Sequence, residues 1–319
     1  MITRSHLRLF GLGRLAYRLW FQPIGSVRDI IAAGGPLEVR RTEQGRREME
    51  AAAYSLPVLP VVNGSVPLEL HLLTGKRFWY QTAFCLWTFT RHAGRPLAPV
   101  IYDDGTLTAE FCEPIQRLFP KVRFVSQKEI ISRLDAHLPT ARFPTLRERW
   151  QNYPNIRKLT DIHAGESGWK LVLDSDLLFF QRPQILLDWL KQPAKPLHAV
   201  DCETSYGYPQ TAMNKLTGAP VAQLVNVGLT GLNSSNLDWD KLEFWCRTLI
   251  EKHRTSYYLE QALIAMLVAG QDCAIAPAAD YVTKPGDAEA RDCRAVMHHY
   301  VADSKKWYFR HCWRVAMNR

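Results

Sequence analysis

Residues 170–180, with the sequence KLVLDSDLLFF, form an apolar run that two carboxylates interrupt. Apolar residues on both sides of the interruption are typical of a strand buried on both faces. Residues two apart in an extended chain point the same way, so Asp174 and Asp176 converge on one point. Two carboxylates that close repel each other unless a cation or a proton lies between them. One interpretation is a divalent metal at the carboxyl end of a strand, and the other is a strand that runs into an Asp-Ser-Asp turn.

The segments before this run alternate between strand and helix patterns. The expected strands are residues 68–75, 97–102 and 122–126, and the expected helices are residues 78–92, 108–119, 128–134 and 144–159. This order predicts a parallel sheet with right-handed crossovers, which is a natural nucleotide site because ligands collect beyond the strand ends. The fold class is therefore α/β, with a Rossmann-like, mostly parallel central sheet flanked by helices.

The segments after the run continue the alternation. The expected strands are residues 197–201 and 224–233, and the expected helices are residues 184–191, 240–253 and 256–269. Residues 202–223 are rich in Gly, Pro, Tyr and Thr, and we expect a long irregular loop there. Loops of that length in compact domains are usually functional or disordered.

Composition limits the classes of partner. The net charge of +9 favours anionic partners such as phosphorylated substrates, nucleic acid or an acidic membrane surface. Nucleic acid is the weakest of these, because no zinc-finger, helix-turn-helix or aromatic RNA-binding motif is present. The seven cysteines are scattered and form no C-x-x-C pair, which fits reduced thiols in a cytoplasmic protein better than a disulfide framework or a zinc site. No run of apolar residues reaches transmembrane length.

The chain divides at the sequence level into a basic N-terminal helical extension, residues 1–60, and a larger domain, residues 61–319. Residues 1–28 contain five arginines and no acidic residue, with apolar residues among them at roughly helical spacing. Such a segment can make peripheral contact with an anionic membrane surface. The alternative is a docked helix whose arginines face water, and both interpretations stay open.

Several short motifs follow one another along the chain. They are Arg157, the D-x-D motif Asp174-Ser175-Asp176, the N-x-G motif Asn226-Val227-Gly228, the acidic-Gln pair Glu260-Gln261, and a C-terminal group of His299, Lys305 and Trp307. In this order and spacing the chain resembles the GT-A fold glycosyltransferases, most closely the retaining family that includes glycogenin and bacterial lipopolysaccharide galactosyltransferases. The resemblance covers residues 68–308. Two residues depart from the family's H-x-x-G-x-x-K-P-W pattern: Ala302 replaces its glycine and Lys306 its proline.

The resemblance implies a metal site and a phosphate site. Asp174, Asp176 and His299 would bind the metal, although the sequence leaves His298 open as an alternative to His299. Carboxylate oxygens with a ring nitrogen make a ligand set that suits Mn²⁺, with Mg²⁺ as a substitute. Lys305 and Arg157 would reach the phosphates of a nucleoside-diphosphate sugar donor.

Six further residues complete the expected site. Thr74 and Asp104, at the ends of expected strands, are candidates for contact with the base and ribose of the donor. By resemblance, Glu260, Gln261, Asp201 and Asn226 would face the donor sugar and the acceptor. Each residue also has a purely structural interpretation: Asn226 can serve backbone geometry, and Asp104 can serve turn chemistry.

The sequence therefore predicts a metal-dependent, cytoplasmic glycosyltransferase. It would move a sugar from a nucleotide-sugar donor to a saccharide, lipid-linked or protein acceptor, with retention of configuration if the family's stereochemistry applies. One alternative is a non-catalytic GT-A-like module that binds a saccharide or a partner protein. Another is a phosphatase of the haloacid-dehalogenase type, in which the D-x-D motif supplies a nucleophile and a general acid. That motif usually opens the first strand of its domain, whereas three expected strands precede it here.

Overall fold

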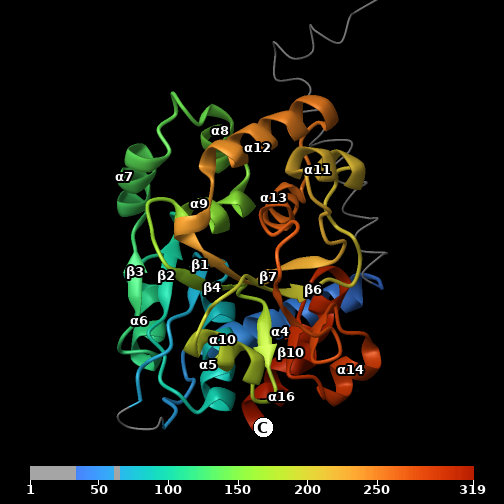
Figure 1. Cartoon of the computed structure of the whole chain (residues 1–319). Helices are drawn as coiled ribbons and strands as arrows, with labels where there is room; N and C mark the ends of the chain where they lie inside the picture. The colour runs from blue at the N-terminus through green and yellow to red at the C-terminus, as the bar shows by residue number, and fades with distance from the viewer. Residues whose placement is uncertain (1–33, 61–64) are drawn as a thin grey trace, which may run out of the picture.

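The computed structural model describes residues 34–60 and 65–319 (Figure 1). The segment 1–28, for which we expected either membrane contact or a docked helix, lies outside the described residues. Within the described part of the chain, no helix is both long and apolar enough to span a membrane.

A seven-stranded sheet runs through the middle of the molecule (Figure 1). Its order is β3-β2-β1-β4-β7-β6-β8. Neighbouring strands run parallel except β7, which is antiparallel to both β4 and β6. The strands are β1 (His71–Thr74), β2 (Val100–Asp103), β3 (Arg123–Val125), β4 (Trp169–Leu173), β6 (Leu197–Val200), β7 (Val225–Asn233) and β8 (Ala274–Ala276). The predicted mostly parallel central sheet is confirmed.

A second, three-stranded sheet lies beside the first. It has the order β5-β10-β9, with β5 (Leu177–Phe179), β9 (Tyr281–Thr283) and β10 (Met297–His299). The single strand expected over residues 170–180 is therefore wrong: β4 ends at Leu173, a turn follows, and β5 begins in the other sheet. Two backbone hydrogen bonds hold this turn, from Asp174 N to the Gly228 carbonyl (2.8 Å) and from Tyr300 N to the Asp176 carbonyl (3.1 Å).

Two hydrophobic cores cover opposite faces of the large sheet, because side chains alternate along its strands. In β4, for example, Leu171 and Leu173 belong to one core and Val172 to the other. The helices of the first core are α4 (Pro36–Ala53), α5 (Trp79–Ala93), α6 (Ala109–Leu118), α10 (Gln184–Lys191), α14 (Asp287–Asp292) and the C-terminal run of α15 (Lys305–Trp307), the π-helical η5 (Tyr308–Cys312) and α16 (Trp313–Asn318). Those of the second are α7 (Gln127–His137), α8 (Pro144–Asn152), α9 (Arg157–His163), α11 (Gln210–Thr217), α12 (Trp239–His253) and α13 (Leu259–Leu267).

Helix α5 shows how the local sequence sets an element. Its residues from Trp79 to Thr90 are all buried, since the helix lies between the two sheets and contacts β1 and β5. It ends at Gly94, which adopts a left-handed conformation (φ 65°) that glycine reaches without steric cost. The predicted helix and its glycine stop are confirmed.

Two predicted segments differ from the structure. The single helix expected over residues 144–159 is two helices, because Pro154 lacks a backbone N–H and begins a short 3₁₀ turn, η2 (Pro154–Ile156), between α8 and α9. The irregular loop expected over residues 202–223 contains helix α11, which ends at Gly218 (φ 71°). Two further 3₁₀ turns are η3 (Ser234–Asn236) and η4 (Ala302–Ser304).

The described part of residues 1–60 packs against the C-terminal helices. Met49 and Ala53 of α4 are fully buried in the first core. Gly45 touches η5 so closely that a β-carbon there would lie 2.3 Å from the carbonyl oxygen of Phe309. Arg310 also donates to the Thr42 hydroxyl (2.8 Å). Helix α4 is therefore an integral layer of the described fold.

Candidate active site

A cavity of about 510 Å³ opens at the carboxyl ends of several strands. Thr74, Asp104, Asp174 and Asp201 lie at the ends of β1, β2, β4 and β6 and line it. The structure brings all the residues predicted from the sequence to this one cavity. They are Thr74, Asp104, Arg157, Asp174, Asp176, Asp201, Asn226, Glu260, Gln261, His299 and Lys305.

Two aspartates and a histidine meet at its base. His299 Nε2 lies 3.4 Å from Asp176 Oδ1 and 3.7 Å from Asp174 Oδ2. This nitrogen is buried and makes no hydrogen bond with any described residue. The other ring nitrogen, Nδ1, lies 3.1 Å from the side-chain oxygen of Asn226 and donates to it. With the proton on Nδ1, Nε2 directs its lone pair between the carboxylates, which is the arrangement that a divalent cation fits.

Two lysines bind the outer oxygens of the same carboxylates. Lys158 Nζ lies 2.8 Å from Asp174 Oδ1, and Lys305 Nζ lies 3.1 Å from Asp176 Oδ2. Each aspartate thus gives one oxygen to a lysine and turns the other toward His299. Burial raises the pKa of Asp176, but His299 in its protonated form and Lys305 more than offset it and hold that pKa well below its usual value. Asp176 is therefore ready to act as an anionic ligand.

Gly228 explains why the histidine can reach this position. A β-carbon at residue 228 would lie 2.3–2.8 Å from three atoms of the His299 ring. The N-x-G motif thus has two functions around one side chain: Asn226 orients the imidazole, and Gly228 leaves space for it. His298, the alternative ligand, points away from the cavity, because neighbouring residues on a strand face opposite sides.

Glu260 and Gln261 come from the first turn of α13. Glu260 Oε1 lies 3.5 Å from Lys158 Nζ, and burial raises the pKa of Glu260 to about 7 despite that lysine. The side-chain nitrogen of Gln261 donates to Asp201 Oδ2 (2.7 Å) and to the carbonyl of Val225 (3.0 Å).

Thr74, Asp104 and Arg157 lie together at another part of the lining. Asp104 packs so closely on Gly75 that a β-carbon there would lie about 2 Å from its carboxylate. Arg157 donates to the carbonyl of Asp104 (2.7 Å) and stacks over the Trp150 ring, 4.7 Å from its centroid. Its guanidinium therefore holds the backbone at the end of β2 in place.

Ala302, the departure from the family glycine, keeps the backbone conformation that a glycine would supply. Its φ of 48° lies in the left-handed region, where a β-carbon costs about 1 kcal/mol or more. The same short segment joins β10 to Lys305. The other departure, Lys306, lies against Trp307, whose indole N–H donates to Asp287 (2.9 Å).

The sequence interpretation missed several residues that line the cavity. The side chain of Lys158 is only 13% exposed, and its pKa is raised because Asp174 and Glu260 outweigh the lowering effect of burial. Its only signal in the sequence was its place next to Arg157 in an expected helix. Three aromatic residues, Phe78, Tyr257 and Tyr258, also line the cavity and are exposed to solvent.

Solved structures provide a comparison for this fold. The crystal structure of the galactosyltransferase LgtC in complex with donor and acceptor sugar analogues is similar to 78% of this chain and to 95% of its own, with a TM-score of 0.52 and 14% identity. Mouse xyloside xylosyltransferase 1 matches 75% of this chain and 99% of its own, with a TM-score of 0.49 and 14% identity. The likeness to the galactosyltransferase confirms the predicted GT-A fold, and at this identity it extends to the fold alone.

Sequence comparisons add no closer relative. No protein-family model matches the chain, and no curated protein matches it significantly.

Proposed function

We propose that the protein is a metal-dependent glycosyltransferase that uses a nucleoside-diphosphate sugar as donor. The observation that carries the proposal is the unpartnered, buried Nε2 of His299, directed between Asp174 and Asp176 at the base of a large cavity. Two carboxylate oxygens and one imidazole nitrogen are a ligand set that suits Mn²⁺, with Mg²⁺ as a substitute. The shared fold with a galactosyltransferase supports the same reaction class.

The bound cation and the two lysines beside it would have different roles. A divalent cation bound there supplies a Lewis acid for the negative charge that develops on the departing diphosphate. Lys305, with its side chain 39% exposed, can turn from Asp176 to a phosphate oxygen as a point charge. Lys158 is too deeply buried for that movement, and it fixes the orientation of Asp174.

The remaining polar residues suit the two sugars. Glu260, Gln261 and Asp201 line the same cavity as the metal ligands, and the hydrogen bond from Gln261 to Asp201 holds both of those side chains in place. We assign them to the donor sugar and the reacting centre. Exposed Tyr257 and Tyr258 offer flat surfaces for an acceptor saccharide, free or lipid-linked. Thr74 and Asp104 are assigned to the nucleoside. Retention of anomeric configuration is the expected stereochemical outcome.

Donor hydrolysis tests the proposal directly. The full-length chain would be incubated with a panel of nucleotide sugars, with and without Mn²⁺, and release of nucleoside diphosphate would be measured. We expect Mn²⁺-stimulated release from at least one donor. Asp176→Asn should reduce that release by about 100-fold or more, because losing a group that only orients a metal ligand already costs about 10–100-fold.

The matched control is Asp272→Asn, which removes a carboxylate whose side chain is 84% exposed and lies outside the cavity lining. This variant should retain full release. Metal-stimulated release that survives Asp176→Asn would refute the ligand assignment. If a folded sample releases no diphosphate from any donor, the chain is better explained as a non-catalytic module that binds a saccharide or a partner.

A further inference from the structure

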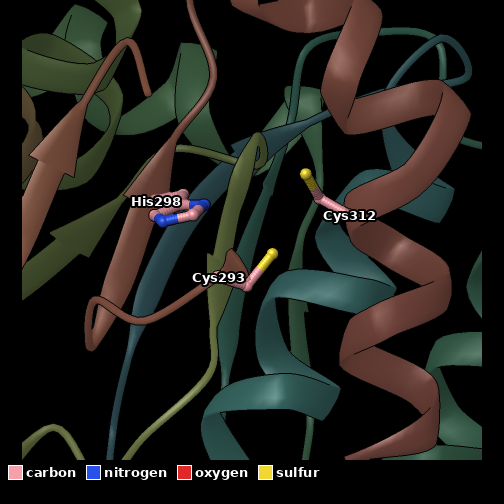
Figure 2. Close-up of side chains that lie close together, drawn as sticks. All are labelled: Cys293, His298 and Cys312. Carbon is pink, nitrogen blue, oxygen red and sulfur yellow. The ribbon is translucent and has the colours of Figure 1, made fainter. Parts of the chain in front are cut away.

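A second group of metal-binding side chains lies on the opposite side of β10 from the cavity. Figure 2 shows Cys293, from the segment after α14, Cys312, from the end of η5, and His298, from β10, directed toward a common point. Their candidate ligand atoms all lie within 4.8 Å of one another. All three residues are completely buried.

The histidine of this group is oriented as metal-binding histidines are. His298 Nε2 lies 2.8 Å from Glu289 Oε1, so this nitrogen carries the proton and donates to the carboxylate. Nδ1 therefore keeps a lone pair. Metal-binding histidines usually donate one ring N–H to a carboxylate in this way, which orients the other ring nitrogen toward the metal.

The sulfur atoms share one neighbour. The Sγ atoms of Cys293 and Cys312 lie 3.3 and 3.2 Å from the carbonyl oxygen of Ala290. The Tyr300 hydroxyl lies 2.8 Å from His298 Nδ1. Two sulfurs and one ring nitrogen therefore lie close together, and the Ala290 carbonyl oxygen lies beside both sulfurs.

We propose that Cys293, Cys312 and His298 bind a structural Zn²⁺ ion, with the Ala290 carbonyl as the fourth donor. Two thiolates and an imidazole are the donors that zinc prefers, and a closed site without solvent access is typical of a structural ion. Two thiolates neutralise the charge of Zn²⁺, which lowers the cost of burying it. The Tyr300 hydroxyl then donates to the Cys312 thiolate instead of to Nδ1.

The geometry requires only small movements. Zn–S bonds of about 2.3 Å and Zn–N bonds of about 2.0 Å separate tetrahedral ligands by roughly 3.5 Å, so the side chains move together by about one ångström. The left-handed backbone at Cys293 (φ 46°) is costly for a residue with a β-carbon, and metal ligation offsets that cost. The ion would join the C-terminal helical run to β10, the strand that also carries His299.

Metal analysis of the full-length chain tests this site, and it does not depend on the proposed glycosyltransferase activity. The chain would be expressed with zinc in the medium and dialysed against metal-free buffer, and zinc would be measured by mass spectrometry. We expect about one equivalent in the wild type and in Asp176→Asn. Cys312→Ser should lose it, whereas Cys246→Ser, which changes a buried cysteine of the other core, should retain it.

A second measurement serves if Cys312→Ser fails to fold. A mercurial reagent added to the wild type should release zinc to a coloured chelator in step with thiol modification. Replacement of zinc by Co²⁺ should give an intense thiolate-to-metal absorption band. The proposal is refuted if the wild-type protein contains no zinc and all its thiols react in denaturant. The three side chains would then form only a hydrogen-bonded network. If two thiols fail to react in denaturant and no metal is found, a disulfide replaces the proposed zinc site. If Asp176→Asn loses the zinc and Cys312→Ser keeps it, the ion binds in the cavity and the proposal is refuted.

Discussion

The two neighbouring histidines of β10 face two clusters that differ in chemistry and in access. His299 meets two carboxylates at the base of a cavity of about 510 Å³, whereas His298 meets two sulfurs in a closed interior. Each imidazole is fixed by a hydrogen bond from its other ring nitrogen, to Asn226 in one case and to Glu289 in the other. The alternation of side chains along one strand is enough to separate the two environments.

The difference between the clusters indicates what each can do. Oxygen donors that open to solvent suit an ion that must also bind substrate phosphates and exchange. Sulfur donors without solvent access suit an ion that stays in place and stabilises the fold. Strand β10 therefore carries a ligand of the proposed catalytic metal on one face and a ligand of the proposed structural metal on the other. A substitution at one of these sites should leave the other intact.

Among variants that leave every proposed metal ligand in place, the largest effect is expected on the cavity side from Gly228→Ala. The added methyl group would overlap the His299 ring and displace it from the aspartates. We expect metal-stimulated donor hydrolysis to fall by about 100-fold, as for other losses of ligand orientation, while the zinc content is unchanged. Gly286→Ala is the matched control, because no atom lies within 4 Å of a β-carbon there and its φ is −74°. Full activity in Gly228→Ala would show that His299 does not need its present position.

An intermediate effect is expected from Lys158→Met. Removing this ammonium leaves the buried Glu260 and the partly buried Asp174 without their partner, which should lower the free energy of unfolding by about 3 kcal/mol in metal-free buffer. Donor hydrolysis should fall roughly 10- to 100-fold, because Asp174 loses its orientation. Urea denaturation and steady-state rates measure the two effects.

The double variant Lys158→Met/Glu260→Gln separates charge from position. Removing both members of the pair should restore part of the stability without restoring activity. Mn²⁺ should also stabilise Lys158→Met, because the ion binds only the folded state. If stability is unchanged in the single variant, Lys158 is not the counter-ion of this cluster.

The smallest effect is expected from Ala302→Gly. Glycine relieves the left-handed strain at φ 48° but loses more conformational entropy on folding, so we expect a gain of no more than about 1 kcal/mol. Activity should stay within about twofold of the wild type. On the other side of β10, Cys293→Gly relieves similar strain (φ 46°) yet should destabilise the chain, because it removes a zinc ligand. If Ala302→Gly and Cys293→Gly stabilise the chain equally, Cys293 does not bind a stabilising metal ion.

Part of this site follows from short-range sequence rules. The spacing of Asp174 and Asp176 and the position of β1, β2 and β4 were enough to predict converging ligands at strand ends. The reason was partly wrong, because the aspartates lie in a turn between two sheets rather than on one strand. They converge nevertheless, since hydrogen bonds to Gly228 and from Tyr300 hold the turn against β7 and the end of β10.

Other features depend on contacts that the sequence does not encode locally. Lys158 gave no periodic or motif signal, because its place is set by a helix that begins after the Pro154 break. Cys293 and Cys312 are 19 positions apart by their numbers and share no C-x-x-C spacing, so their approach depends on the packing of η5 against α14. The alternation rule separates His298 from His299 but does not determine which one faces the carboxylates.

Anomalous diffraction from crystals soaked in Mn²⁺ tests the central assignment most directly. We expect a manganese peak at ligand distance from Asp174 Oδ2, Asp176 Oδ1 and His299 Nε2, and no such peak in crystals of Asp176→Asn. A strong peak elsewhere, or no peak in a wild-type crystal that hydrolyses a donor with added Mn²⁺, would contradict the account.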